Sequence, residues 1–167
     1  MSGAAAGERG GGILEAEEFA RAMPAGARLM GLDVGPKTLG VALSDVTRTI
    51  ASRFTTLSRS KFTADVRRLL ELAAEHGVGG LVIGLPINLD GSLGPRAQAT
   101  RAFARGLSKL TAIPILTWDE RLSTAAAERT LLEADMSRRR RAQVIDKVAA
   151  TLILQSALDR LKLFDRG

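Results

Sequence analysis

Residues 28–45 read RLMGLDVGPKTLGVALSD, and they decide what kind of sheet the chain can build. The apolar run over 28–35 ends in glycine and is typical of a buried strand. The three residues PKT at 36–38 lead into a second apolar run over 39–45, and so short a connection predicts an antiparallel hairpin. Residues 49–57 (TIASRFTTL) alternate loosely and are rich in Thr, so they predict a third strand beside the hairpin.

Beyond this stretch, strands and helices alternate. The spacing of apolar residues predicts strands over 79–86 and 113–118 and helices over 61–77, 95–110, 124–134 and 142–163. Residues 119–123 are expected to form a turn in which Ser123 caps the next helix, and residues 134–141 are expected to form a basic loop. The element order predicts an α/β fold: a mixed five-stranded sheet, antiparallel at its start, with helices on both faces.

The length of 167 residues is typical of one domain. The first dozen residues, MSGAAAGERGGG, are rich in Gly and Ala, so residues 1–26 are expected to form a flexible tail, with at most a short helix over 13–23. Residues 27–167 then form the domain. The formal net charge is +6; residues 1–27 hold four Glu and two Arg, so residues 28–167 carry +8. This excess indicates a polyanionic partner such as nucleic acid.

Composition excludes several kinds of chemistry. The chain has no Cys and one His, which excludes disulfides, thiolate nucleophiles and multi-histidine metal sites. No apolar run approaches the ~18 residues of a membrane span, and the first residues lack the charge and apolar pattern expected of a secretory signal. A serine triad would have to use His76, so any hydrolytic chemistry is expected to come mostly from carboxylates, lysines or a bound metal.

Asp33 is the first candidate carboxylate. Side-chain alternation places it on the face of Leu29 and Gly31, opposite Met30 and Leu32. A charged side chain on a central strand is costly unless a partner satisfies it. Asp33 is therefore a candidate for a metal or phosphate site; the alternative is that it accepts hydrogen bonds from the following turn.

Further carboxylates stand at two other places. Asp119 and Glu120 follow the strand over 113–118, and Asp146 lies in the first turns of the last helix. Negative charge near a helix start is favourable in itself, which is the alternative reading of all three. Together with Asp33, however, they form the oxygen ligand set that Mg²⁺ or Mn²⁺ prefers. Two such ions about 4 Å apart can promote phosphodiester hydrolysis.

Four stretches in fixed order resemble the YqgF/RuvX-type family of the RNase H-like superfamily. They are GLDVGPKTLGVALSD (31–45), VIGLPINLDGSLGP (82–95), WDERLST (118–124) and IDKVAATLILQSAL (145–158). The resemblance implies a ribonuclease H-like fold in a bacterial cytoplasmic protein. It also implies a nuclease associated with maturing the 5′ end of pre-16S rRNA, in a family earlier regarded as Holliday-junction resolvases.

The same resemblance implies roles for individual residues. Asp33, Glu120 and Asp146 match the family's metal ligands, which makes them the expected catalytic residues around Mg²⁺ or Mn²⁺, with two ions expected. Asp119 is the alternative if the turn presents it in place of Glu120. The family usually has a basic residue after the motif's Lys, whereas Thr follows Lys37 here, so Lys37 is left as the phosphate contact of this turn.

Several polar residues are candidates for contacts to the substrate. They are Lys37, Asn88, Arg96, Arg121, Arg138, Arg139, Arg140 and Arg141. Arg96 opens a predicted helix, where phosphate binds readily, although the loop over 86–95 could instead be purely structural. The run of four arginines could be a solvated surface or could attract a phosphate backbone. Aromatic residues make up 4% of the chain, so recognition by shape and phosphates is expected rather than base stacking.

Three other functions compete with processing of pre-rRNA by a metal-dependent nuclease. One is cleavage of branched DNA at a Holliday junction. The second is a non-catalytic RNA-binding assembly factor, for which the residue after Lys37 is the support. The third is a nucleotide-binding phosphotransferase, which would need a second lobe that this chain does not contain. The expected state is a monomer or a homodimer in the cytoplasm.

Overall fold

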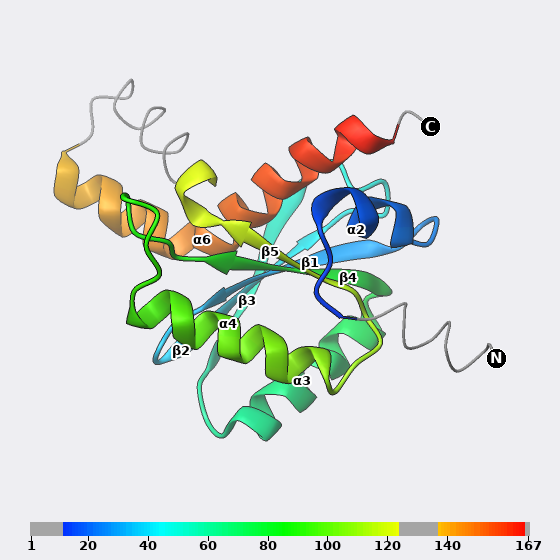
Figure 1. The fold of residues 1–167 in the computed structure, drawn as a ribbon, viewed down its shortest axis with the longest axis horizontal. Coiled ribbons are helices and arrows are strands. Elements are labelled where there is room, and N and C mark those ends of the chain that lie inside the picture. The colour runs from blue at the N-terminus through cyan, green and yellow to red at the C-terminus, as the bar shows by residue number, and fades with distance from the viewer. Residues whose placement is uncertain (1–11, 124–136, 166–167) are drawn as a thin grey trace.

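The computed structural model describes residues 12–123 and 137–165, without the side chains of residues 142–147. In chain order its elements are α2 (Ala16–Ala22), β1 (Arg28–Val34), β2 (Thr38–Ser44), β3 (Ala51–Ser58), α3 (Phe62–Glu75), β4 (Val78–Leu85), α4 (Pro95–Ser108), β5 (Ile115–Asp119), α6 (Arg138–Leu161) and the 3-10 helix η1 (Lys162–Phe164). The strands form one five-stranded sheet in the order β3-β2-β1-β4-β5 (Figure 1). β1–β2 and β2–β3 are antiparallel, and β1–β4 and β4–β5 are parallel. The predicted mixed sheet is confirmed.

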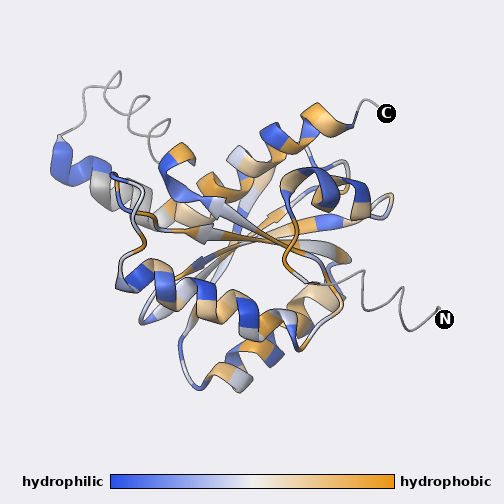
Figure 2. Cartoon of the chain, in the orientation of Figure 1, coloured by the Kyte–Doolittle hydropathy of each residue, from blue (hydrophilic) through white to orange (hydrophobic). Residues whose placement is uncertain are grey.

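Side-chain alternation in β1 divides the core into two halves, as predicted. Met30 and Leu32 belong to the cluster that includes residues of α3 and α4. Leu29 belongs to the cluster on the opposite face, with Phe19 of α2 and residues of α6. Figure 1 shows α3 and α4 on one side of the sheet and α2 and α6 on the other, and Figure 2 shows hydrophobic residues along the central strands. Asp33 therefore lies on the α6 face of the sheet.

Gly31 lets α6 approach the centre of the sheet closely. A Cβ atom at this position would lie 2.7 Å from Leu154 Cβ and 3.0 Å from the Ala150 carbonyl oxygen, so any larger residue would force the helix away. Because α6 rests directly on β1, its residues are held at a fixed distance from Asp33. Within the described ranges, no helix is long and apolar enough to cross a membrane.

The N-terminal segment corrects one prediction. The flexible tail expected over residues 1–26 is wrong for residues 13–26, because this segment packs on the domain. Ile13 forms a β-bridge with Ile115, and the Leu14 N–H donates a hydrogen bond to the Ile115 carbonyl at 2.8 Å. Phe19 of α2 is 0% exposed. The burial of one aromatic residue in a seven-residue helix is a weak signal in sequence, and residues 1–11 lie outside the described residues.

The start of α6 corrects a second prediction. Arg138–Arg141 do not form a loop but the first turn of α6, which begins four residues earlier than expected. Ser137 is the N-cap, and its Oγ accepts a hydrogen bond from the Arg140 N–H at 3.3 Å. Arginine is a good helix former, so the cap decides where the helix begins despite the unfavourable positive charge at its N-terminus.

The segment after β5 corrects a third prediction. Residues 120–123 are already helical, so they do not form a turn and Ser123 is not a helix cap. The Ser123 hydroxyl donates to the Glu120 carbonyl at 3.1 Å. Asp119 takes the capping role, since its Oδ1 accepts the Arg121 N–H at 2.9 Å. The helix expected over 124–134 lies outside the described residues.

Candidate active site

Asp33 and Glu120 come together at one edge of the sheet. Because β1, β4 and β5 run parallel, their carboxyl ends lie at the same edge, where open α/β sheets place their sites. Asp33 precedes the last residue of β1, and Glu120 directly follows β5. Their carboxyl groups are hydrogen-bonded to each other, and both are half-buried. Two neighbouring carboxyl groups form an arrangement that a divalent cation would stabilise.

The electrostatics of Glu120 reflect this arrangement. Burial is the main cause that raises the pKa of Glu120 to about 7, and the negative charge of Asp33 adds to it, while Arg96 opposes both. Burial and a neighbouring negative charge both disfavour the ionised form of a carboxyl group.

Gly84 leaves the space that Glu120 occupies. It lies on β4, between the strands that carry the two acids. A Cβ atom at Gly84 would lie 2.9 Å from Glu120 Oε1 and would overlap the side chain of Ile153 on α6. The acid pair, β4 and α6 therefore meet around a position where any side chain would displace Ile153 or Glu120. The space left by Gly84 is compatible with a site in which carboxylate oxygens bind a metal ion between them.

Asp119 does not face Asp33 in the same way, because its carboxylate is engaged by Arg121. The Arg121 Nε and Nη2 atoms donate to it at 3.0 Å and 2.7 Å. These hydrogen bonds are the main reason why the pKa of Asp119 is lowered, although burial opposes them. The geometry therefore favours Glu120 over Asp119 as the partner of Asp33. Arg121 holds Asp119 in place, and its expected contact with substrate stays a prediction.

Asp146, the third expected ligand, has a side chain outside the described residues. Its backbone belongs to α6, one helical turn before Ala150, and residues four apart share a helix face. Ala150 lines a cavity together with Asp33. Among the described side chains there is no group of three or more that could hold a metal ion; Asp33 and Glu120 are the part of the site that the structure describes.

Two of the expected phosphate contacts lie near the acid pair. Arg96 is exposed at the start of α4, and its Nη2 donates to the Val34 carbonyl at 3.4 Å, next to Asp33 in sequence. Its charge acts on Glu120. Lys37 is exposed in the turn between β1 and β2, where its carbonyl accepts the Arg59 N–H at 2.8 Å. Both cations lie at the edge where the strands carrying the acids end.

The loop between β4 and α4 uses its polar groups to hold itself together. Asn88 Nδ2 donates to Ser92 Oγ at 3.0 Å, and Asp90 Oδ1 accepts the Ser92 N–H at 2.9 Å. Gly91 has a φ of 90°, a left-handed conformation that favours glycine. Arg121 Nη1 reaches the Asn88 carbonyl at 3.4 Å. These contacts favour the interpretation that the loop is structural. The Asn88 side chain stabilises the loop through its hydrogen bond to Ser92.

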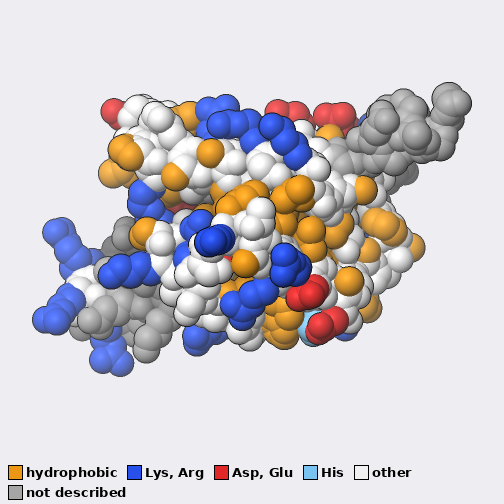
Figure 3. All heavy atoms as spheres, turned by 90° about the horizontal axis from the view of Figure 1, so that it is seen from below, with side chains coloured by type: hydrophobic (Ala, Val, Ile, Leu, Met, Phe, Trp, Pro, Cys, Tyr) orange, Lys and Arg blue, Asp and Glu red, His pale blue; other side chains and the backbone are white. Residues whose placement is uncertain are grey.

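The four arginines at the start of α6 lie further from the acid pair. Arg138, Arg139 and Arg140 are exposed, and Arg141 is half-buried. Figure 3 shows Lys and Arg side chains projecting from the end of the molecule where α6 begins. Arg138 stands twelve residues before Ala150, or about 18 Å along the helix axis at 1.5 Å per residue. Arg141 stands only five residues before Asp146 on the same helix, so the run leads along α6 toward the expected third ligand, and its contact with substrate stays a prediction.

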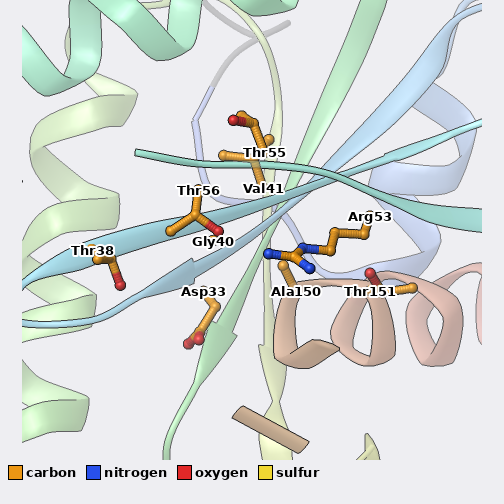
Figure 4. Close-up of a pocket in the computed structure, with 9 residues that line it drawn as sticks. All are labelled: Asp33, Thr38, Gly40, Val41, Arg53, Thr55, Thr56, Ala150 and Thr151. Carbon is orange, nitrogen blue, oxygen red and sulfur yellow. The ribbon is translucent and has the colours of Figure 1, made fainter. Parts of the chain in front are cut away.

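A cavity of about 190 Å³ adjoins Asp33 on the side facing β3 (Figure 4). Arg53 and Thr151 contribute to its lining, and the sequence analysis singled out neither of them. A lone arginine in a Thr-rich strand carries no motif. Strand register could have placed Arg53 near Asp33. Asp33 pairs with Gly40 on β2, and Arg53 pairs with Ala42, two residues further along the same strand.

Comparison with solved structures defines the class of this fold. RuvC of T. thermophilus in complex with a Holliday junction substrate aligns with a TM-score of 0.52 at 14% identity, over 83% of this chain and 97% of that one. A second Thermus thermophilus RuvC structure aligns with a TM-score of 0.52 at 11% identity, over 81% and 97%. The fold is therefore that of the RuvC-like, ribonuclease H-like proteins.

Sequence comparison then identifies the family. The family model described as "RuvX: Holliday junction resolvase" matches residues 27–160, and the chain belongs to this family. A protein of Paracoccus denitrificans (strain Pd 1222) is 59% identical over 150 residues, covering 90% of this chain and 95% of its own. A protein of Rhizobium etli (strain CIAT 652) is 54% identical over 155 residues, covering 93% and 94%. Both are named "Putative pre-16S rRNA nuclease". The resemblance expected from the sequence is confirmed.

Proposed function

We propose that this protein is a divalent-metal-dependent nuclease that hydrolyses phosphodiester bonds in structured nucleic acid. The observation that carries the proposal is the half-buried pair Asp33 and Glu120 at the carboxyl ends of β1 and β5. Membership of the RuvX family and the net charge of +6 support the same conclusion. A positive surface attracts phosphate, and a carboxylate pair attracts the cation that phosphodiester chemistry uses.

The residues that would hold the metal are Asp33, Glu120 and Asp146. Oxygen ligands without His or Cys suit Mg²⁺ or Mn²⁺. When bound, one or two such ions would supply an activated water and stabilisation of the leaving oxygen. The chain's own contribution is to hold the two described carboxyl groups in contact, with Gly84 leaving them room. Lys37 and Arg96 would orient the phosphate at the same edge of the sheet.

The substrate that we propose is the 5′ end of pre-16S rRNA, processed during ribosome biogenesis in the cytoplasm. The names of the relatives from P. denitrificans and R. etli support this choice. A Holliday junction is the second candidate, favoured by the description of the family model. Both substrates are structured, phosphate-rich and compatible with recognition by shape.

Cleavage assays with both substrates test the proposal. A pre-16S rRNA fragment and a four-way DNA junction are incubated with Mg²⁺ and with wild type, Asp33→Asn, Glu120→Gln or Asp146→Asn. We expect cleavage of the RNA by wild type and a loss of at least about 100-fold in each variant, since each removes a ligand of the catalytic ion. Preferential cleavage of the four-way junction would make branched DNA the first candidate substrate and pre-16S rRNA the second.

The matched control is Asp159→Asn. Asp159 is an exposed carboxylate on α6, the helix that carries Asp146, and it accepts a hydrogen bond from Gln155 at 3.0 Å. This variant should retain full activity. Equal activity in wild type and Asp33→Asn, or RNA binding with no cleavage in any metal, would remove the nuclease proposal and favour a non-catalytic RNA-binding protein.

A further inference from the structure

The cavity beside Asp33 has a lining that suits an anion. It is lined by residues of β1, β2, β3 and α6, and its volume of about 190 Å³ has room for more than one water molecule. Gly40 lines the cavity without a side chain, opposite Asp33 in the β1–β2 pairing. Figure 4 shows Arg53 entering from β3 and pointing between Gly40 and Ala150 toward Asp33. A single strand of nucleic acid passing Asp33 would meet this cavity next.

Arg53 and Asp33 are the charged residues that line the cavity, and Arg53 is the cation of the two. It is exposed and makes no hydrogen bond or ion pair with any of the described residues. Its situation differs from that of Arg59, which is tied to Asp65 at 3.1 Å, and from that of Arg121, which is tied to Asp119 at 2.7 Å. A guanidinium group presents several N–H donors that match phosphate oxygens in geometry. Arg53 therefore offers a phosphate contact that no described carboxylate occupies.

Hydroxyl groups complete the lining. Thr38, Thr55, Thr56 and Thr151 all contribute to the cavity. Thr151 Oγ1 is buried and has no hydrogen-bond partner among the described residues. A buried hydroxyl without a partner is unfavourable, so such a group in a native structure calls for a ligand or an ordered water. Thr151 lines the same cavity as Arg53, and its hydroxyl could donate to an oxygen bound there once a ligand displaces the atoms that cover it.

We propose that this cavity binds a phosphodiester group of the substrate strand adjacent to the group that is cut, with Arg53 as its charged contact and Thr151 as a hydrogen-bond donor. The proposal rests on the nuclease function proposed above and adds a second phosphate position to it. An apolar ligand does not fit, because hydroxyls and a guanidinium dominate the lining. In this proposal the strand passes from the acid pair toward β3 over Gly40.

Neutral-linkage mapping tests the role of Arg53. Affinity for a pre-16S rRNA 5′ fragment is measured in EDTA, so that nothing is cut, with single methylphosphonate linkages placed at each position in turn. We expect Arg53→Gln to weaken binding of the unmodified strand about tenfold. At one linkage, adjacent to the mapped cut site, neutralisation should abolish the difference between wild type and Arg53→Gln. Arg53→Lys should restore part of the affinity.

The matched control is Arg67→Gln on α3, an exposed arginine that lines none of the cavities described. It removes the same charge and should change affinity less than about twofold, as expected for a rim charge far from the strand. A uniform loss at every linkage with Arg53→Gln, or equal losses with Arg53→Gln and Arg67→Gln, would overturn the proposal.

Thr151→Val gives an independent readout with effects of opposite sign. Removing the unpartnered hydroxyl should raise the unfolding midpoint of the free protein by about 2–4 °C, while weakening binding of the strand several-fold. A purely structural threonine would lose stability and leave binding unchanged, and that result would overturn its role. If wild type binds and cuts the strand but no linkage couples to Arg53, this proposal fails alone; if wild type neither binds nor cuts, the proposed function fails with it.

Discussion

Glu120 and Asp33 place two carboxyl groups where burial and mutual repulsion resist full ionisation. These causes, burial first, raise the pKa of Glu120 to about 7. Asp33→Asn removes the neighbouring charge, so the Glu120 pKa should fall in this variant. It should stay above its ordinary value of 4.5, because burial remains. Carboxyl ¹³C chemical shifts followed through a pH titration of the metal-free protein measure both midpoints.

The control for this titration is Asp119→Asn. The charge of Asp119 is the smallest of the causes that act on Glu120, so its removal should lower the Glu120 pKa less than Asp33→Asn does. A Glu120 midpoint near 4.5 in wild type, or equal shifts in the two variants, would contradict the described pairing of Asp33 with Glu120.

Gly84 and Gly40 form a matched pair of glycines near Asp33. A Cβ atom at Gly84 would overlap Ile153 and approach Glu120 Oε1 to 2.9 Å, whereas one at Gly40 would lie 3.5 Å from Asp33 Cβ. Gly84→Ala should therefore cost about 1–3 kcal/mol of unfolding free energy. Gly40→Ala should change it by less than about 1 kcal/mol, because its new neighbours lie at ordinary van der Waals distances. Urea denaturation measures both, and a tolerated Gly84→Ala would argue against the close packing of α6 on this site.

At the scale of elements, Asp65 fastens the start of α3 to the turn after β1. Its carboxylate is 1% exposed and accepts hydrogen bonds from the Ser60 N–H and Oγ at 3.0 Å each and from Arg59 at 3.1 Å. Arg59 in turn donates to the Gly35 carbonyl at 2.7 Å. Burial alone would raise the pKa of Asp65, but the hydrogen bonds from Ser60 and Arg59 outweigh it and lower the pKa.

This network predicts a pH-dependent contribution to stability. Because the folded-state pKa of Asp65 is below its ordinary 3.8, the stabilisation is full above that pH and is lost as the pH falls through the lower folded value. Asp65→Asn should cost about 1.5–3 kcal/mol at pH 7, and the difference from wild type should shrink below about pH 4. Denaturation across pH 2–7 measures it, with the exposed Glu71→Gln on α3 as control. A difference independent of pH would contradict the role of the ionised carboxylate.

The start of α6 makes a separate prediction about binding. Replacing Arg138–Arg141 with Gln keeps a good helix former at each position while removing four positive charges. The slope of log affinity for nucleic acid against log salt concentration should fall by about 0.7–0.9 for each phosphate that these arginines neutralise in the wild type. Arg101→Gln, an exposed change on α4, should leave the slope nearly unchanged. An unchanged slope in the fourfold variant would show that the run is a solvated surface.

At the scale of the whole molecule, apolar alternation was enough to predict the sheet. The short hairpin around Pro36 required an antiparallel pair, and the alternation around Asp33 correctly predicted its face. The N-terminal segment was misjudged because its attachment depends on Phe19 filling a distant part of the core, which no local pattern reveals. The beginning of α6 was misjudged because one cap, Ser137, outweighs the appearance of a charge run.

The candidate site could be predicted only in part. The sequence predicts that Asp33 and the acids after the last strand form one ligand set, but the choice between Asp119 and Glu120 depends on where the Arg121 side chain lies. Two adjacent acidic residues cannot be told apart as metal ligands from sequence alone, because the difference arises when a basic side chain pairs with one of them. Arg53 was not found, because its relation to Asp33 runs across two strand pairings and through the space that Gly40 leaves open.

The central claim is that Asp33, Glu120 and Asp146 hold the ion that the proposed nuclease uses. Anomalous X-ray diffraction from a crystal soaked with Mn²⁺ tests it most directly. The account predicts one or two Mn²⁺ ions at the carboxyl ends of β1 and β5, with oxygens of these three residues about 2.0–2.3 Å from the metal. Mn²⁺ bound elsewhere, or a peak that Asp33 and Glu120 do not touch, would contradict it.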